Sequence, residues 1–282
     1  MSNSIAVSSG IFTASDGCSI AYSLHAGSPQ VGAHARSRIA LIHSLALDRS
    51  VWDGVVPLLT PHADVLTYDC RGHGQSGRAK MTFTPELFAA DLAGLFGHLG
   101  WPDAVVAGCS MGGCVAQAFA GLYPGRTPAL ALIDTTAWYG PTAPEAWRER
   151  AQTAASKGLQ ALSEFQATRW VSDAFREAHA ELIGTKMAVF LANDIDCYVA
   201  TCEMLGDADL RHYQPAMRMP ASVIVGAEDY ACPIAMSEQM LEAMPDATLS
   251  VLANVRHLTP IECPAIIADE ILALMKRSAA RA

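Results

Sequence analysis

The sequence predicts an α/β fold with a mostly parallel sheet and helices on both faces, and two observations support this prediction. Short apolar segments, typical of strands buried on both faces, recur from residue 38 to residue 253. Segments with helical periodicity separate most of them, and such alternation is typical of parallel strands joined by crossover helices. The chain has 282 residues and is 51% hydrophobic, so it can bury a core of the required size.

Apolar periodicity and turn signals predict the individual elements. Two short strands are expected within residues 10–27, around the turn Ser15-Asp16-Gly17. Six buried strands are predicted at residues 38–43, 63–68, 104–107, 129–135, 221–225 and 248–253. Helices are predicted at residues 48–59 and 84–99, from Met111 onward, and at residues 233–244 and 263–276.

One long stretch interrupts the alternation. Residues 138–213 show only helical periodicity, and a strand pattern resumes after them. We therefore predict that residues 138–213 form a helical insertion, a lid over one end of the sheet. The remaining segments, 1–137 and 214–282, would form the core domain.

Charge and composition exclude several classes of partner. The net charge is −9 and no basic run is present, which argues against nucleic acid or an anionic membrane as a partner. No apolar run has the length of a membrane helix, and the first residues lack the pattern of a secretory signal. The eight cysteines form no C-x-x-C pair, and no nearby histidine completes a metal site at the pairs Cys109/Cys114 and Cys197/Cys202. We expect a soluble cytoplasmic protein with reduced thiols, without metal or cofactor.

The segment Val105–Gly113, VVAGCSMGG, combines a strand pattern, a serine between glycines and the start of a helix. In a sharp strand-to-helix turn, a serine is held in a strained conformation that exposes its hydroxyl, and glycines permit the close packing. The helix start also directs free N–H groups and a positive dipole end toward this point. Ser110 is therefore the candidate nucleophile.

A serine nucleophile needs a base that is itself oriented by a third group. His257 follows the last predicted strand and is the candidate base. Asp229 follows the preceding strand and is the preferred acid. Asp134, at the end of another strand, and Glu228 remain alternatives for the acid.

An oxyanion formed during acyl transfer needs two N–H donors. The Met111 N–H is one candidate, and the loop after the strand at residues 38–43 would supply the other. Leu45 is the expected donor in that loop. His43 is expected to pack beneath it.

Several motifs together resemble those of α/β-hydrolases over about residues 18–275: His43-Ser44, Asp69-x-Arg71-Gly72-x-Gly74-x-Ser76, Gly108-x-Ser110-x-Gly112-Gly113, Gly226-x-x-Asp229-x-x-x-Pro233, and His257 followed by Glu262 and Pro264. Within that superfamily the chain resembles 3-oxoadipate enol-lactonases at His43-Ser44-Leu45, Arg169-Trp170 and residues 198–202 and 207–211. The resemblance implies an eight-stranded sheet with a helical cap and a Ser110, Asp229, His257 triad. It also implies that the chain hydrolyses a carboxylic ester or lactone through an acyl-enzyme, without a cofactor.

The insertion supplies the candidates for substrate binding. We predict that four of its residues contact the substrate: Trp138, Arg169, Trp170 and Met187. Most of the other apolar side chains are needed for packing within the insertion. Basic residues that could pair with a substrate carboxylate are Arg148, Arg150, Arg169, Arg176 and Lys186. Arg169 is preferred among them because it adjoins Trp170 in the lactonase-like segment.

Two other functions are compatible with a complete triad. The chain could act as a ligand receptor with negligible turnover. It could also transfer the acyl group to peroxide or to an alcohol, as a cofactor-free perhydrolase or acyltransferase. We favour hydrolysis, because every catalytic part is present.

Overall fold

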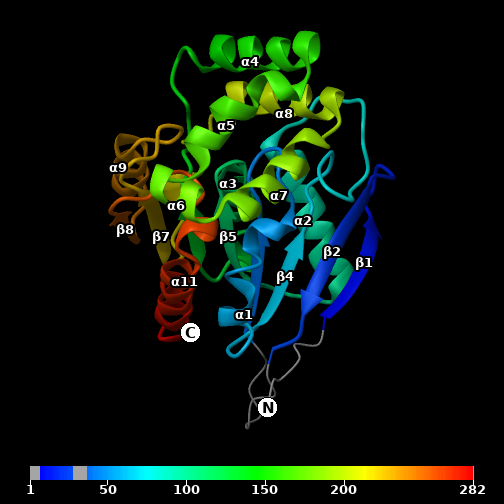
Figure 1. The fold of residues 1–282 in the computed structure, drawn as a ribbon. Helices are drawn as coiled ribbons and strands as arrows, with labels where there is room; N and C mark the ends of the chain where they lie inside the picture. The colour runs from blue at the N-terminus through cyan, green and yellow to red at the C-terminus, as the bar shows by residue number, and fades with distance from the viewer. Residues whose placement is uncertain (1–6, 28–36, 282) are drawn as a thin grey trace.

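The computed structural model describes residues 7–27 and 37–281. Within these ranges eight strands form one sheet in the order β1-β2-β4-β3-β5-β6-β7-β8 (Figure 1). Their bounds are β1 Val7–Thr13, β2 Ser19–His25, β3 Arg38–Ile42, β4 Asp64–Tyr68, β5 Val105–Cys109, β6 Leu130–Ile133, β7 Ala221–Gly226 and β8 Ala247–Leu252. β2 is antiparallel to both β1 and β4, and the other neighbouring strands are parallel. The predicted fold class is confirmed.

Helices cover both faces of this sheet. Those of the core are α1 Val56–Leu59, α2 Pro85–Leu99, α3 Met111–Leu122, α9 Ile234–Ala243, α10 Thr259–Glu262 and α11 Pro264–Ala279. α1 packs against α11 on one face, and α2 packs against α3 on the other (Figure 1). α9 packs against β7 and β8 at the edge of the sheet. No helix in the described ranges combines the length and apolarity needed to cross a membrane.

The helix predicted at residues 48–59 is instead two short pieces. A 3₁₀-helix, η1, spans Arg49–Trp52, and α1 begins only at Val56. Pro57 explains the break, because proline lacks the N–H that a continuous helix would need there and its ring crowds the preceding turn. Of the positions predicted for the inner face of this helix, Val51, Trp52 and Val55 are buried, whereas Leu58 is 41% exposed.

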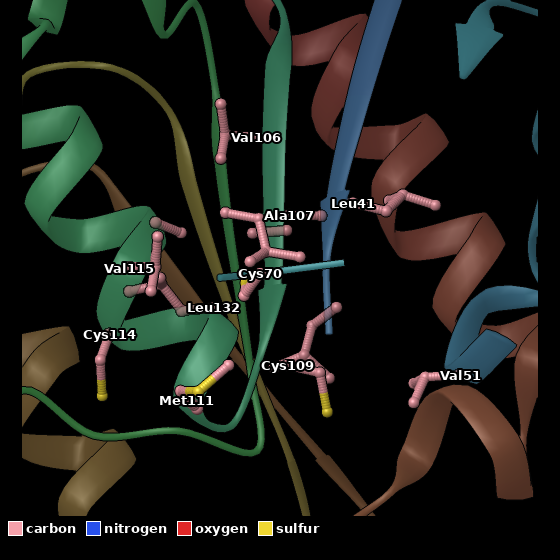
Figure 2. Packing of buried hydrophobic residues seen from close by; sticks show 14 of the residues in the cluster. Leu41, Val51, Cys70, Val106, Ala107, Cys109, Met111, Cys114, Val115 and Leu132 are labelled. Carbon is pink, nitrogen blue, oxygen red and sulfur yellow. The ribbon is translucent and has the colours of Figure 1, made fainter. Parts of the chain in front are cut away.

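The centre of the sheet is apolar on both faces. Every residue of β5 is buried, as are residues 39–42 of β3. In Figure 2, Val106 and Ala107 of β5 lie in the same apolar cluster as Val115 of α3 and Leu132 of β6. Packing on two faces holds β5 firmly, so the residue at its carboxyl end has a fixed position.

Five α-helices lie between β6 and β7, and we call them the helical segment. They are α4 Ala143–Lys157, α5 Ser163–Trp170, α6 Asp173–Ala178, α7 Ala180–Leu191 and α8 Ile195–Asp207. Figure 1 shows α4, α5 and α8 beyond the upper end of the strands. Trp138 pairs with Asp209 in an antiparallel bridge, and the Leu210 N–H donates to the Ala137 carbonyl at 2.9 Å. The chain therefore leaves and rejoins the core at adjacent points.

Candidate active site

Ser110 forms the sharp turn between β5 and α3. β5 ends at Cys109 and α3 begins at Met111, so this one residue connects the central strand to its helix. Its backbone has φ 56° and ψ −118°, a conformation that residues other than glycine rarely adopt. The structure thus contains the predicted strand, strained turn and helix.

Two glycines allow the backbone to pack this tightly. A Cβ atom on Gly108 would overlap the Gly112 carbonyl group, and one on Gly112 would overlap the Ile42 carbonyl group. A side chain at either position would push α3 away from β3 or β5, and Ser110 would move with the helix. Both glycines of the motif are therefore steric requirements of the turn.

His257 and Asp229 lie in line with Ser110. Ser110 Oγ is 2.8 Å from His257 Nε2, and His257 Nδ1 is 2.8 Å from Asp229 Oδ2. The second carboxylate oxygen accepts the N–H groups of Ala231 and Cys232 at 2.7 and 2.9 Å. With its Nδ1–H donated to Asp229, the imidazole offers Nε2 as an acceptor to the serine hydroxyl. The structure brings together the three residues selected from the sequence as nucleophile, base and acid.

The two alternative acids lie elsewhere. Asp134 is fully buried and accepts hydrogen bonds from the Gly226 N–H and from both the N–H and the hydroxyl of Thr259. Burial and the nearby Asp229 carboxylate raise the pKa of Asp134 well above its usual range. Glu228 lies at the surface, 3.7 Å from Arg256 Nε. Neither carboxylate is bonded to the His257 ring.

Leu45 and Met111, the predicted N–H donors, flank Ser110. Leu45 lines the same cavity as Ser110, and Met111 is the first residue of α3. Neither N–H donates a hydrogen bond to another group in the described part of the chain. Ala46, beside Leu45, has φ 56°, so the loop after β3 is also strained. Two unused donors therefore remain near Ser110.

A cavity of about 670 Å³ lies over Ser110 and His257. Arg169 and Trp170 line it, as do Trp147 and Phe165 of the helical segment. The other wall residues from the core include Ser44, Tyr230, Ala231, Pro233 and Met236. The cavity combines an apolar lining with a few polar groups, which is typical of small-molecule sites.

Two of the predicted substrate contacts are not part of the cavity wall. Trp138 is held in the bridge with Asp209, and the Arg211 guanidinium lies over its ring at 3.8 Å. Met187 is half-buried on α7 and packs against the core cluster. Both residues therefore serve packing in this structure, while Arg169 and Trp170 line the cavity.

The structure also sorts the five basic candidates. Arg150 lines the cavity together with Arg169, and its Nε donates to the Tyr198 hydroxyl at 2.7 Å. Arg169 donates to the Tyr230 carbonyl at 3.1 Å. Both guanidinium groups lie over the Phe165 ring, at 5.7 and 4.4 Å from its centre, and neither forms an ion pair within the described residues. Burial and the neighbouring Arg150 lower the pKa of Arg169.

The other three cations lie outside this cavity. Arg148 faces a separate hollow that is lined by Glu86, Glu203 and Asp207 among others. Arg176 pairs with Asp173 at 2.8 Å, and Lys186 Nζ donates to the Ser50 carbonyl at 2.7 Å. Arg150 was among the basic candidates but was not preferred, because helical periodicity does not tell which face of α4 is turned toward Ser110.

One group of side chains has the spacing of metal ligands. Within the described residues, ligand atoms of Asp229, Cys232 and His257 lie within 4.8 Å of one another. Asp229 and His257 already use these atoms in hydrogen bonds. Burial and the Asp229 charge raise the pKa of Cys232 well above its usual range, so the thiol keeps its proton. The arrangement therefore favours proton transfer over metal binding.

Comparison with known proteins identifies the class to which this fold and this site belong. Residues 39–270 match the alpha/beta hydrolase family, and the chain belongs to that family. It is 29% identical over 242 residues to 3-oxoadipate enol-lactonase 2 of Acinetobacter baylyi, covering 86% of this chain and 90% of that protein. The predicted resemblance to enol-lactonases is confirmed.

Solved structures agree with this assignment. The enol-lactonase from Burkholderia xenovorans has a TM-score of 0.88 and 30% identity, covering 95% of this chain and 100% of that one. A thermophilic esterase from Thermogutta terrifontis, described with malate bound, has a TM-score of 0.86 and 28% identity over 96% and 99% of the two chains. Hydrolases acting on esters and lactones are thus homologous to this protein.

Proposed function

We propose that this protein is a serine hydrolase that cleaves a carboxylic ester or lactone through an acyl-enzyme on Ser110. The observation that carries the proposal is the continuous chain of two 2.8 Å contacts from Ser110 through His257 to Asp229 at the floor of a cavity. Homology to enol-lactonases and esterases supports the same chemistry.

The geometry accounts for each step of the reaction. His257 Nε2 takes the Ser110 proton as Oγ attacks the acyl carbon, and Asp229 stabilises the resulting imidazolium. The N–H groups of Leu45 and Met111 donate to the oxyanion. His257 then gives its proton to the departing alkoxide oxygen, which in a lactone stays attached to the acyl group. A water molecule, activated by the same histidine, releases the acid.

Residues 138–213 form the cap of the site in this proposal. Their helices supply one side of the cavity wall, including Trp147, Phe165 and Trp170. Arg150 and Arg169 provide two positive groups without carboxylate partners in the described residues. A substrate that carries a carboxylate away from the scissile bond fits this wall.

Replacing Ser110 with alanine tests the proposal. The variant should keep the melting temperature and circular dichroism spectrum of the wild-type protein, because the side chain loses only its hydroxyl. It should lose almost all turnover of a small aryl ester, since the acyl-enzyme cannot form. Full activity in this variant, or loss of wild-type activity on adding a chelator, would contradict the mechanism.

Pre-steady-state kinetics separates hydrolysis from the two alternatives. A hydrolase with an acyl-enzyme should release the aryl alcohol of the first turnover in a burst and then continue with water as acceptor. A receptor would release about one equivalent at most and stop. An acyltransferase or perhydrolase would turn over faster when excess alcohol or peroxide replaces water as the acceptor.

A further inference from the structure

The loop that carries His257 is tied to the helical segment on both sides of the histidine. On one side, Arg256 Nη1 donates to the Thr168 carbonyl at 2.8 Å. On the other, the Leu258 N–H donates to the Trp170 carbonyl at 2.7 Å. Both carbonyl groups belong to the last turn of α5. The position of the base is therefore coupled to one helix of the helical segment.

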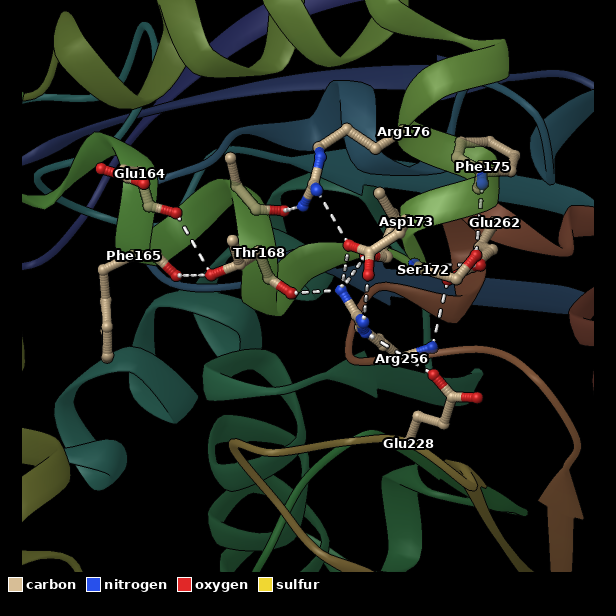
Figure 3. Close-up of polar contacts among 12 residues, drawn as sticks. Glu164, Phe165, Thr168, Ser172, Asp173, Phe175, Arg176, Glu228, Arg256 and Glu262 are labelled. Atoms are coloured by element: carbon tan, nitrogen blue, oxygen red, sulfur yellow. Dashed lines mark hydrogen bonds and ion pairs between the residues drawn. The ribbon is translucent and has the colours of Figure 1, made fainter.

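Both terminal nitrogens of the Arg256 guanidinium group donate hydrogen bonds in this contact (Figure 3). Nη1 and Nη2 each donate to a carboxylate oxygen of Asp173, at 2.9 and 3.1 Å. Nη1 also donates to the Val171 carbonyl at 3.2 Å. The Arg256 side chain is only 10% exposed, whereas the Asp173 side chain is 59% exposed, so solvent screens the ion pair from the Asp173 side. A guanidinium that holds a carboxylate through two parallel bonds fixes orientation as well as distance.

Arg256 also contacts the loop that carries the acid. Its Nε lies 3.7 Å from the carboxylate of Glu228, the residue before Asp229. Its guanidinium lies over the ring of Tyr230, the residue after Asp229, at 5.2 Å from the ring centre. Because Arg256 immediately precedes His257, a single side chain braces the loops of both the base and the acid.

The main chain completes this connection. Glu262 accepts the N–H groups of both Arg256 and Ser172 at 3.1 Å (Figure 3). Ser172 is the N-cap residue of α6, and Asp173 is the first residue of that helix. The junction between α5 and α6 is thus bound to the His257 loop by side-chain and main-chain groups together.

We infer that Arg256 is a positioning residue that fixes His257 relative to Ser110 by docking the α5–α6 junction onto the base loop. The inference rests on the proposed function. α5 also carries Arg169 and Trp170 of the cavity wall, so a substrate that steadies α5 also steadies the base. Misplacing a catalytic group by about 1 Å costs about 100-fold in rate, and Arg256 prevents such a displacement.

Two substitutions test this role, with a matched control. Arg256→Gln removes the guanidinium group with its charge, and Asp173→Asn removes the negative charge of the carboxylate that it holds. Arg176→Gln is the control, because Arg176 pairs with the same Asp173 from within the helical segment and, in the part of the chain that the structure describes, forms no hydrogen bond or ion pair with the His257 loop. Asp173 is 59% exposed, so its variant should fold even if Arg256→Gln does not.

The readouts are steady-state kinetics on a neutral aryl ester and the rate at which an uncharged aryl fluorophosphonate modifies Ser110. Both reactions need the base correctly placed. We expect Arg256→Gln to lower kcat and the modification rate about tenfold or more, with little change in KM. Asp173→Asn should show a smaller loss of the same kind, and Arg176→Gln should match the wild-type protein.

Melting temperatures distinguish positioning from a purely structural role. If Arg256→Gln and Asp173→Asn melt earlier yet keep wild-type kcat and modification rate at a temperature where they are folded, the inference is overturned. Equal losses in Arg176→Gln would overturn it as well. If wild-type protein shows no Ser110-dependent turnover, the proposed function fails first, independently of Arg256.

Discussion

The Asn193 side chain donates a hydrogen bond of 2.7 Å to the carbonyl group of Ala46, a residue with φ 56° in the loop after β3. Asn193 follows α7, so the bond joins the helical segment to the loop that carries Leu45. We predict that Asn193→Ala lowers kcat/KM about tenfold, because the Leu45 N–H loses its fixed direction. Hydrolysis of a neutral aryl ester measures the effect.

Thr185→Ala is the control for this prediction. Thr185 lies on α7, the helix that precedes Asn193, and among the described residues its hydroxyl donates only to the Glu181 carbonyl one turn earlier. It should leave kcat/KM unchanged. Asn193 also donates to the Val189 and Phe190 carbonyls, so some loss of stability is expected in its variant. Wild-type kcat/KM in folded Asn193→Ala protein would refute the role in catalysis.

Replacing the buried carboxylates of Asp229 and Asp134 one at a time separates catalysis from folding. Asp229→Asn should lower kcat by about 10⁴-fold, because an amide cannot hold the Nδ1–H tautomer of His257. Asp134→Asn should lower kcat less than tenfold but reduce the free energy of unfolding by about 1–3 kcal/mol, since it disturbs the bonds to Thr259 and Gly226. Ester kinetics and urea unfolding measure the two effects. The reverse pattern would make Asp134 the acid.

Local patterns explain why the strands and Ser110 were predictable. A strand buried on both faces needs an unbroken apolar run, and the tight turn at Ser110 excludes any Cβ at Gly108 and Gly112. Such requirements can be recognised in a sequence segment of a few residues. Asp134 and Asp229 both follow strands, by contrast, and only the partner of each carboxylate, Thr259 or His257, distinguishes them.

The helical segment was predictable as helices but not in its arrangement. Helical periodicity shows that α4 and α7 have apolar faces, yet it does not give their rotation relative to the sheet. Arg150 therefore could not be preferred over Arg148, one facing the cavity and the other a different hollow. The positions of Trp138 and Met187 likewise depend on docking between elements far apart in sequence.

Two buried histidines should make the protein sensitive to mild acid. Burial lowers the pKa of His43 to about 4, and burial together with His43 lowers the pKa of His73 to about 3. Between pH 6.5 and pH 4 the unfolded chain binds protons at both rings while the folded protein does not. The two histidines therefore do not reduce the free energy of unfolding at a pH well above 6.5. As the pH falls below 6.5, that free energy decreases by up to about 1.4 kcal/mol per pH unit for each histidine.

Urea unfolding from pH 8 to pH 4 measures this dependence. His43 Nε2 accepts the Cys70 N–H at 2.9 Å and Nδ1 donates to the Ser44 carbonyl at 2.7 Å. Glutamine offers one acceptor and one donor of similar reach, so His43→Gln should flatten part of the slope below pH 6.5. His212→Gln, at an exposed position, is the control. An unchanged slope in His43→Gln would show that other groups cause the acid sensitivity.

Arg169 and Arg150 should select substrates that carry a negative charge. Each guanidinium lies in the cavity wall over Phe165 without an ion-pair partner among the described residues. A charged hydrogen bond contributes about 1.5–3 kcal/mol, so Arg169→Ala should raise KM for an ester with a distal carboxylate about 10- to 100-fold. The KM for a neutral ester of the same size should hardly change.

The matched control for charge is Arg148→Ala. Arg148 lies on α4, as Arg150 does, but it faces the separate hollow lined by Glu86, Glu203 and Asp207. It should leave both substrates unaffected. Arg150→Ala should raise the KM of the anionic ester as Arg169→Ala does, and the double variant should show less than the sum of the two effects if both contact one carboxylate. Equal losses on the anionic and neutral esters would mean that Arg169 acts through its bond to the Tyr230 carbonyl, holding α5 against the core. Carboxylate recognition would then be abandoned, and the protein would be an esterase for neutral substrates.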